Sequence, residues 1–313
     1  MYKNGFPSFA RLVMTLPAAP VTAAEIDPDL WCLFDQYVHG DIDRRAFLKR
    51  AARFAAASGT TAAALLAALN PDFAHAQQVP PTDARLKTGF VEFASPNGYG
   101  KARAYVVRPA SGTGPWPVVL VIHENRGLNP HIEDVARRLA LENFIAVAPD
   151  ALFPIGGYPG DEDKARDLFA TLDQTKTRED FVTAATFARG IAGSSGKLGA
   201  VGFCYGGGMV NLLATRLPEL LAGAPFYGAP APLDQVASIK AELALTFADN
   251  DERINGAWPP YMAALKAAGV KYAVRRYPGT QHGFNNDTTP RFDAAAAREA
   301  WATMLALFDR TLR

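Results

Sequence analysis

The stretch GAVGFCYGGGMVNLLA, residues 199–214, decides the fold of this chain. It opens with a short apolar run that leads to Cys204, continues through Gly206 to Gly208, and ends in apolar residues at helical spacing. This order predicts a strand, an abrupt turn and a helix. Residues 202–206, GFCYG, fit the G-x-S-x-G pattern of a nucleophile elbow with sulfur in place of the hydroxyl. Glycines flank such a nucleophile because a Cβ there would collide with the facing backbone.

The same five residues also fit a buried cysteine in a glycine-rich turn, since cysteine is often buried. Other features of the chain have to decide between the two. Its 313 residues are 49 % hydrophobic and 20 % charged, with a net charge of +1. This is an ordinary globular composition, and it gives no sign of a nucleic-acid partner. Two cysteines exclude a disulfide scaffold and a multi-cysteine metal centre. No HExxH, EF-hand loop or P-loop appears, and no GxGxxG opens a helix after a strand, so we expect neither metal nor cofactor.

The first 76 residues differ from the rest of the chain in their sequence pattern. The block RRAFLK at residues 44–49 precedes an alanine-rich apolar run over 54–69, and AHA at 74–76 has the small-x-small pattern of a cleavage site. This order resembles a twin-arginine export signal, although Asp43 stands where Ser or Thr is usual. The sequence therefore predicts a leader over residues 1–76 and a single domain over residues 77–313.

Export would make the twin-arginine machinery a transient partner and the periplasm or the exterior the destination. The apolar run is too short and too rich in Ala and Thr for a stable membrane span, which needs about 20 apolar residues. Two alternatives stay open: an amphipathic helix in a protein that is not exported, and a short separate helix over residues 28–40. After cleavage Cys204 would be the only thiol, and a lone cysteine in an oxidising compartment favours a function for it.

From residue 89 onward the patterns predict alternating strands and helices. A hairpin is expected over 89–109 around Asn97-Gly98, with later strands at 118–123, 144–148, 199–203, 222–227, 241–248 and 271–277. Helices are expected at 129–140, 163–172, 178–192, 258–268 and 290–312. This alternation predicts a doubly wound, mostly parallel α/β sheet. The elbow, the loop at 249–251 and the loop at His282 each follow a strand, so they should meet at one edge of the sheet.

A thiol needs a base to become a good nucleophile, and the base needs an orienting acid. His282, in a loop after the last predicted strand, is the candidate base. His123 ends an apolar strand and His131 begins a helix, which fits a buried and a solvated histidine. Asp249 and Asp251 both remain candidates for the acid. The order nucleophile, acid, histidine is that of α/β-hydrolases.

Five motifs together resemble the dienelactone hydrolases (carboxymethylenebutenolidases) of the α/β-hydrolase fold. They are VIHENRGLN at 121–129, APDALF at 148–153, GFCYGGG at 202–208, ADNDERIN at 248–255 and QHGFN at 281–285. The resemblance implies an ester or lactone hydrolase with Cys204 as nucleophile, His282 as base and Asp251 as acid. It also implies that Glu124 contacts the resting thiol, and that the amides of Tyr205 and Asn125 form the oxyanion hole. With Glu124 there, we expect Cys204 to rest mostly protonated.

Members of this family that hydrolyse dienelactone bind its carboxylate with arginines, one of them shortly after the histidine. Here that stretch reads Asn285-Asn286-Asp287. We therefore expect a neutral substrate, with Arg126 and Asn286 as candidate substrate contacts and Asp287 repelling anions. The alternatives are a carboxylesterase or thioesterase using the same residues, and a non-catalytic binding or thiol redox protein.

Overall fold

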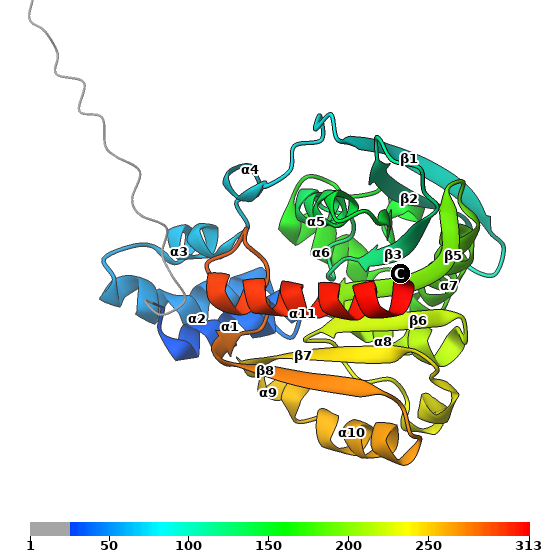
Figure 1. Cartoon of the computed structure of the whole chain (residues 1–313). Helices are drawn as coiled ribbons and strands as arrows, with labels where there is room; N and C mark the ends of the chain where they lie inside the picture. The colour runs from blue at the N-terminus through cyan, green and yellow to red at the C-terminus, as the bar shows by residue number, and fades with distance from the viewer. Residues whose placement is uncertain (1–25) are drawn as a thin grey trace, which may run out of the picture.

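The computed structural model describes residues 26–313 and is built around one eight-stranded sheet (Figure 1). The strand order is β1-β2-β4-β3-β5-β6-β7-β8. The strands are β1 (Leu86–Ser95), β2 (Gly100–Pro109), β3 (Trp116–Ile122), β4 (Ile145–Pro149), β5 (Ser194–Phe203), β6 (Leu220–Phe226), β7 (Glu242–Asn250) and β8 (Tyr272–Gln281). The β1–β2 and β2–β4 pairs are antiparallel, and every other pair is parallel. The predicted α/β-hydrolase fold is confirmed.

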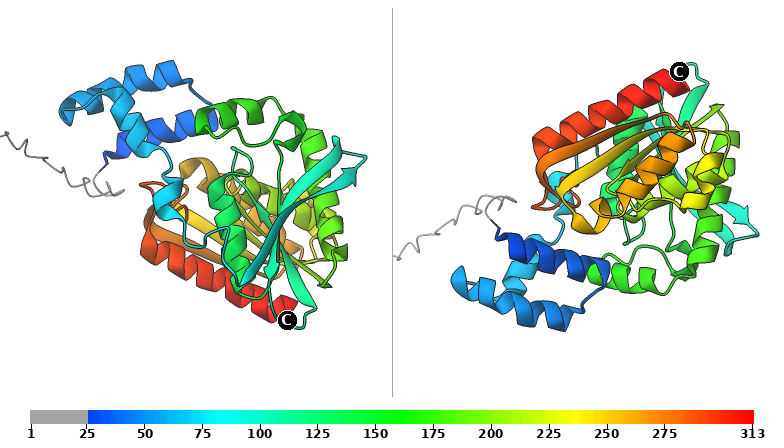
Figure 2. Two further views of the ribbon diagram at one scale, coloured as in Figure 1. Left: turned by 90° about the horizontal axis from the view of Figure 1, so that it is seen from above. Right: turned by 90° about the horizontal axis from the view of Figure 1, so that it is seen from below.

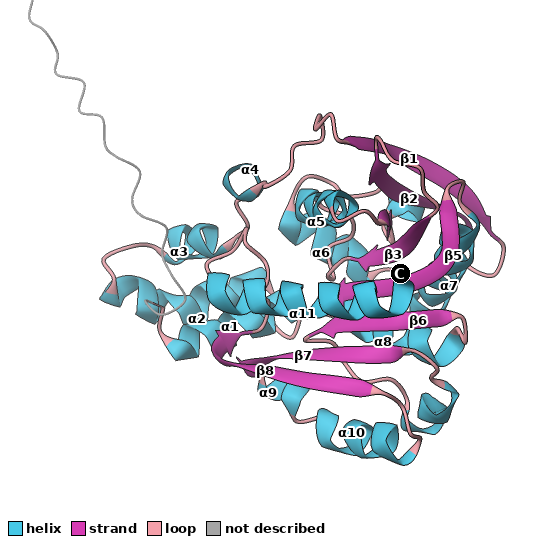
Figure 3. Cartoon of the chain, in the orientation of Figure 1, coloured by secondary structure: helices cyan, strands magenta, loops and turns pink. Residues whose placement is uncertain are grey.

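Helices cover both faces of this sheet (Figure 3). The helices of the region are α5 (Pro130–Leu141), α6 (Glu162–Ala170), α7 (Gln174–Gly190), α8 (Tyr205–Arg216), α9 (Glu252–Asn255), α10 (Trp258–Ala267) and α11 (Ala294–Leu312). One apolar core joins the sheet to α5 and α11, and a second joins the opposite face to α7, α8 and α10. Because β3, β6 and the second half of β5 are covered on both sides, they read as continuous apolar runs.

Four further helices precede the sheet: α1 (Pro28–His39), α2 (Arg44–Ala57), α3 (Ala62–Leu69) and α4 (Phe73–Ala76). The first three share an apolar cluster that includes Phe34, Tyr37 and Phe47. The alternative of a short helix over residues 28–40 is thereby confirmed. Figure 2 shows α1 and α2 beside the main body, next to α6, and we call residues 26–69 the N-terminal cap.

The twin-arginine block has a structural explanation within this cap. Arg44 begins α2, and Phe47 is fully buried in the apolar cluster. Asp43, the departure from the export pattern, is the N-cap of α2 and accepts a hydrogen bond of 2.7 Å from the amide of Ala46. Export itself stays a prediction. Within residues 26–313 no single helix is long and apolar enough to cross a membrane. Taken together, α2 and residues 62–76 have the length and composition of a membrane span, but they are bent by 98° relative to each other.

Differences from the predicted elements fall at the edges. β5 begins at Ser194, five residues earlier than expected, because its first half is polar and only partly buried. β8 continues through Pro278 and Gly279 to Gln281. Proline is tolerated there because β8 is an edge strand and needs no donor on its free side. α11 starts at Ala294, where Asp293 caps it, and α9 has no counterpart among the predicted helices.

Candidate active site

Cys204 stands at the turn between β5 and α8. Its backbone has φ 55° and ψ −111°, a conformation that non-glycine residues rarely adopt. A Cβ on Gly202 would lie 2.1 Å from the carbonyl oxygen of Gly206, so strand and helix can approach this closely only through glycine. The elbow expected from the sequence is therefore present, and it lifts the thiol to the carboxyl edge of the sheet.

His282 and Asp251 meet beside this thiol. His282 follows β8, Asp251 follows β7, and His282 Nδ1 lies 2.6 Å from Asp251 Oδ2. Both residues are 5 % exposed. The carboxylate holds Nδ1 and so fixes the orientation of the ring. The other ring nitrogen, His282 Nε2, is buried and has no hydrogen bond among the described residues. Asp251, rather than Asp249, is the acid that pairs with the histidine.

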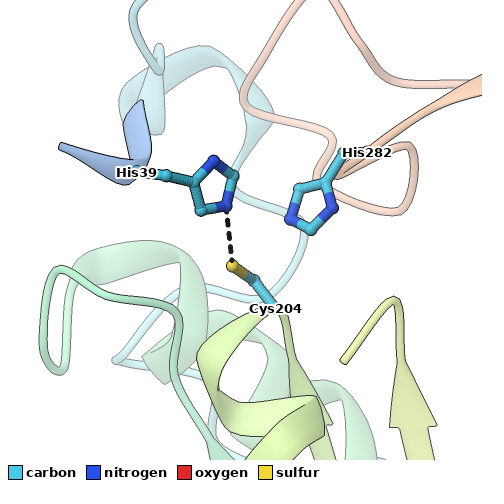
Figure 4. A group of neighbouring side chains, drawn as sticks. All are labelled: His39, Cys204 and His282. Atoms are coloured by element: carbon cyan, nitrogen blue, oxygen red, sulfur yellow. Dashed lines mark hydrogen bonds between the residues drawn. The ribbon is translucent and has the colours of Figure 1, made fainter. Parts of the chain in front are cut away.

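A second histidine, which the sequence reasoning missed, also reaches the sulfur. His39 is the last residue of α1, and its Nε2 lies 3.5 Å from Cys204 Sγ. The His39 and His282 ring centroids are 5.0 Å apart. Figure 4 shows the two rings on neighbouring sides of the thiol, coming from elements far apart in the chain. His39 escaped notice because it lies within the predicted leader.

Asp35 lies one helical turn before His39 and orients its ring. His39 Nδ1 is 2.8 Å from the carbonyl oxygen of Asp35 and 3.3 Å from its Oδ1. The Asp35–His39 pair thus resembles the Asp251–His282 pair on another side of the same sulfur. A signal for it exists in the sequence: an aspartate and a histidine four residues apart, at the end of a helix that Gly40 terminates.

The two imidazoles set the charge of the thiol. Burial alone would raise the pKa of Cys204, but the positive charges of His282 and His39 lower it to about 5. Burial would lower the pKa of both histidines, and the thiolate charge instead raises it, to about 10 for His282 and to about 9 for His39. The aspartate behind each ring adds to this effect. These shifts favour a Cys204 thiolate paired with imidazolium over a neutral thiol beside neutral imidazole.

Glu124 has a different environment from the one the family resemblance implies. Its Oε2 accepts a hydrogen bond of 3.2 Å from Asn286 Nδ2. The groups that shift the thiol are His282 and His39, and they lower its pKa. The pKa shift of Cys204 thus runs opposite to the expectation of a mostly protonated resting thiol.

A small polar cavity of about 40 Å³ adjoins the thiol on the His282 side. Its polar walls include Glu124, Arg126, Asn286 and Arg291. Both arginines are already paired: Arg126 Nε lies 3.0 Å from Glu162 Oε2, and Arg291 Nη1 lies 3.6 Å from Asp35 Oδ1. The predicted substrate contacts Arg126 and Asn286 do lie beside the thiol, but each arginine charge is balanced by an internal carboxylate.

Asp287 does not act as the sequence suggested. Its Oδ2 lies 2.7 Å from Arg138 Nη2, and its Oδ1 lies 3.3 Å from His131 Nδ1. It lines other cavities, away from Cys204. The expected repulsion of an anionic substrate by Asp287 is therefore wrong. The argument for a neutral substrate depends instead on the internal pairing of Arg126 and Arg291.

A larger cavity of about 730 Å³ opens on the His39 side of the thiol. Most of its walls are apolar: Met209, Leu212, Ala229, Pro230, Leu233, Ile254, Ala257 and Pro260. Its polar and charged lining comes from few residues, among them Arg178 and Arg253 at the rim and Asn125 and His39 close to the sulfur. A cavity of this size and character suits a small organic molecule with an apolar group.

The residues expected to form the oxyanion hole lie on either side of the elbow. Tyr205 is the first residue of α8, so its amide has no acceptor within the helix and is available to a ligand. Asn125 follows β3, and its side-chain Nδ2 donates a hydrogen bond of 2.9 Å to the carbonyl oxygen of Val38 in α1. The N-terminal cap therefore fixes this loop.

The other candidates have structural roles. Asp249 Oδ2 accepts a hydrogen bond of 3.0 Å from the Gly279 amide, and its Oδ1 lies 2.7 Å from Arg276. His123 is fully buried and accepts a hydrogen bond of 3.2 Å from the amide of Ala151. Among residues 26–313 one histidine and cysteine cluster could hold a metal ion, formed by His39, Cys204 and His282 with ligand atoms within 4.8 Å of one another.

Comparison with known proteins decides the family. A sequence model described as "Dienelactone hydrolase family" matches residues 102–312. The chain belongs to the dienelactone hydrolase family. An Escherichia coli protein named "Putative carboxymethylenebutenolidase" is 32 % identical over 222 residues, which are 66 % of this chain and 82 % of that protein. The crystal structure of a "Putative Dienelactone Hydrolase" from Klebsiella pneumoniae superposes with a TM-score of 0.63 and 28 % identity, over 72 % of this chain and 99 % of that one.

As a member of the dienelactone hydrolase family, the protein is a hydrolase of carboxylic ester or lactone bonds. Two matches extend the comparison. The Escherichia coli "Putative hydrolase fragment YghX" is 51 % identical over 115 residues, 37 % of this chain and 98 % of that protein. A separate sequence model, described as "YqhI-like", matches residues 19–55, so α1 and α2 belong to a recognisable sequence unit of their own.

Proposed function

We propose that the chain is a cysteine hydrolase that cleaves a neutral ester or lactone through Cys204, His282 and Asp251. One observation carries the proposal: the thiol at the elbow lies beside His282, which Asp251 holds at 2.6 Å, and 3.5 Å from His39. Both imidazoles lower the pKa of the thiol. A thiolate is the nucleophilic form of cysteine, so the site is prepared for attack on a carbonyl carbon at neutral pH.

The chemistry follows from the positions of these groups. The Cys204 thiolate attacks the carbonyl carbon, and the amides of Tyr205 and Asn125 stabilise the oxyanion of the tetrahedral intermediate. Each such donor contributes about 3 kcal/mol to transition-state stabilisation. The intermediate then expels the alcohol and leaves an acyl-enzyme, which water hydrolyses. Imidazole beside the sulfur shuttles the proton in both steps.

Cavity shape and charge support a neutral substrate. The cavity of about 730 Å³ has mostly apolar walls, and the two arginines of the small cavity are paired with Glu162 and Asp35. A substrate carboxylate in the small cavity would have to displace one of these pairs, which costs desolvation without new charge compensation. In the large cavity the charged lining is limited to His39, Arg178 and Arg253. Lactones, simple esters and thioesters present the same electrophilic carbonyl. The dienelactone from which the relatives take their name is therefore one member of the class of lactones and esters to which we assign the substrate.

Intact-mass spectrometry tests the nucleophile. Incubation with an activated ester should add one acyl group to the wild-type chain and none to Cys204→Ala, which should also lose turnover. Cys32→Ser is the matched control, because Cys32 is the other cysteine and is exposed. An unacylated but active wild-type enzyme, or an active Cys204→Ala variant, would refute the proposal. Oxidation of Cys204 without any acyl adduct would favour the thiol redox alternative.

Export is a separate proposal, motivated by the RRAFLK block and the AHA site. Cleavage after Ala76 would remove the whole N-terminal cap together with His39. A retained cap would keep His39 at the thiol. Mass spectrometry of the N-terminus, on protein recovered from cell fractions of the native host, decides between these outcomes.

A further inference from the structure

The thiol lies between two cavities, and each cavity has its own histidine. His282 lines the small polar cavity, whereas His39 lines the large apolar one. The small cavity, at about 40 Å³, has no room for a substrate group beyond a few atoms. An alcohol or acyl group of any size must therefore occupy the large cavity, on the side of the thiol where His39 stands.

Both histidines are equipped for proton chemistry, but in different settings. His282 is 5 % exposed and is held by Asp251 at 2.6 Å. His39 is held by Asp35 and also meets Arg253, whose Nη2 lies 2.8 Å from His39 Nε2. Since a guanidinium can only donate, Arg253 pairs with the neutral ring, whose lone pair is then on Nε2. Arg253 is 41 % exposed in its side chain, so it can move away when the ring is protonated.

We propose that His39 is a second catalytic histidine, which protonates the leaving alcohol and later takes a proton from the attacking water. The proposal rests on the cysteine hydrolase function above and divides its proton chemistry between two residues. His282, with Asp251 behind it, remains an imidazolium and holds Cys204 as a thiolate. His39 faces the substrate cavity and cycles between its charged and neutral forms.

The steps balance in protons and charge. Thiolate attack forms the carbon–sulfur bond, and collapse of the intermediate breaks the carbon–oxygen bond to the alcohol, whose oxygen receives the proton of His39. Water then attacks the thioester, gives its proton to neutral His39, and the carbon–sulfur bond breaks with the electron pair returning to sulfur. The carboxylic acid leaves, and the thiolate with two imidazolium groups is restored.

The N-terminal cap is held firmly enough to position such a residue. The Val38 carbonyl accepts from Asn125 at 2.9 Å, next to the thiol. Arg291, which donates to the carbonyl oxygen of His282 at 2.9 Å, packs its guanidinium 4.8 Å from the centre of the Phe34 ring. The loop that carries His282 and the helix that carries His39 are thus tied to the same arginine.

A matched pair of esters separates this role from a structural one. p-Nitrophenyl butyrate and ethyl butyrate give the same acyl-enzyme, but only the ethoxide leaving group needs a proton. In His39→Gln we expect acylation by the nitrophenyl ester to stay within about threefold of wild type, and acylation by the ethyl ester to fall by about 10²-fold or more. Hydrolysis of the common acyl-enzyme should slow similarly, so the nitrophenyl ester gives a full burst and a slow steady state.

His75→Gln is the matched control, because His75 is a histidine of α4 with an 89 % exposed side chain. It should behave as wild type with both esters. His282→Gln should instead lose the burst itself. Equal rates in His39→Gln and His75→Gln, or a His39→Gln variant that loses the burst as His282→Gln does, would overturn the inference.

Chemical rescue provides a second readout. Added imidazole should restore acyl-enzyme hydrolysis in His39→Ala through the large cavity, while a folding defect would not respond. A folded His39→Ala variant that is slow and not rescued would argue against the inference. Failure of the wild type to form any acyl-enzyme would refute the proposed function instead, so the two failures are distinguishable.

Discussion

The pH profile of Cys204 alkylation is the most direct measure of the charges around the thiol. Deprotonation creates the reactive anion, and the neighbouring imidazolium groups favour that anion. The thiolate should therefore persist from neutral pH down to about 5 and be lost as the pH falls through that value. An ordinary cysteine would lose its thiolate at about pH 8.5.

The expected effect of His39→Gln can be worked out from these values. The pKa of Cys204 falls from an ordinary 9.0 to about 5, which corresponds to a stabilisation of the thiolate by about 5 kcal/mol. His282 and His39 are the two cations that provide it. Because burial raises the pKa and is the largest cause, the two cations together provide more than this net shift. If they share it about equally, loss of the His39 charge moves the midpoint up by roughly two pH units or more, to about 7 or above.

Iodoacetamide alkylation in a Cys32→Ser background reports this midpoint for Cys204 alone. The midpoint is the readout, rather than the plateau rate, because a more basic thiolate is also intrinsically more nucleophilic. His75→Gln should leave the midpoint unchanged. Glu124→Ala should not lower it, since Glu124 bonds to Asn286. A wild-type midpoint near 8.5, or a midpoint in His39→Gln equal to that of wild type, would refute the electrostatic reasoning.

Three further predictions concern the acid, the substrate and the leader. Asp251→Asn should lower kcat by about 10²–10⁴-fold with little change in thermal stability, because the imidazole loses its orienting carboxylate; kcat and Tm measure this. A neutral ester should have a higher kcat/KM than its carboxylate-bearing analogue, because Arg126 and Arg291 are internally paired, and a tenfold preference for the anion would contradict this. If the protein is exported, replacing both arginines at 44–45 by lysine should retain it in the cytoplasm, as cell fractionation would show.

Much of this architecture could be predicted because it follows local rules. The buried strands are apolar runs, the elbow requires its glycines, and the loops after β5, β7 and β8 must share one edge of a parallel sheet. These rules placed Cys204, His282 and the loop at 249–251 at one edge, where the structure has them. The choice of Asp251 over Asp249 came from the family resemblance. The predicted start of β5 and the predicted end of β8 were less accurate, because exposed strand residues do not form a continuous apolar run.

His39 could not be found in this way. It lies 165 residues before Cys204, and no strand order places a helix from outside the sheet over the elbow. The contact depends on how α1 packs on loops of the hydrolase domain, through side chains such as Asn125 and Arg291. The five motifs that carry the family resemblance lie between residues 121 and 285, so they contain no information about the cap. Only the three-dimensional structure puts an aspartate–histidine pair of the cap against the thiol.

Asp35 links the two unusual properties of this site. Its carboxylate orients His39 on one side and faces the guanidinium of Arg291 on the other. The contact with His39 favours the protonated form of that histidine at the large cavity. The contact with Arg291 neutralises an arginine charge that could otherwise bind a substrate anion. On the two proposals above, a single residue of the cap would couple proton supply to a preference for neutral substrates. Removing the cap should then affect both at once: the thiol would lose His39, and Arg291 would lose the carboxylate of Asp35 while keeping its bond to the His282 carbonyl.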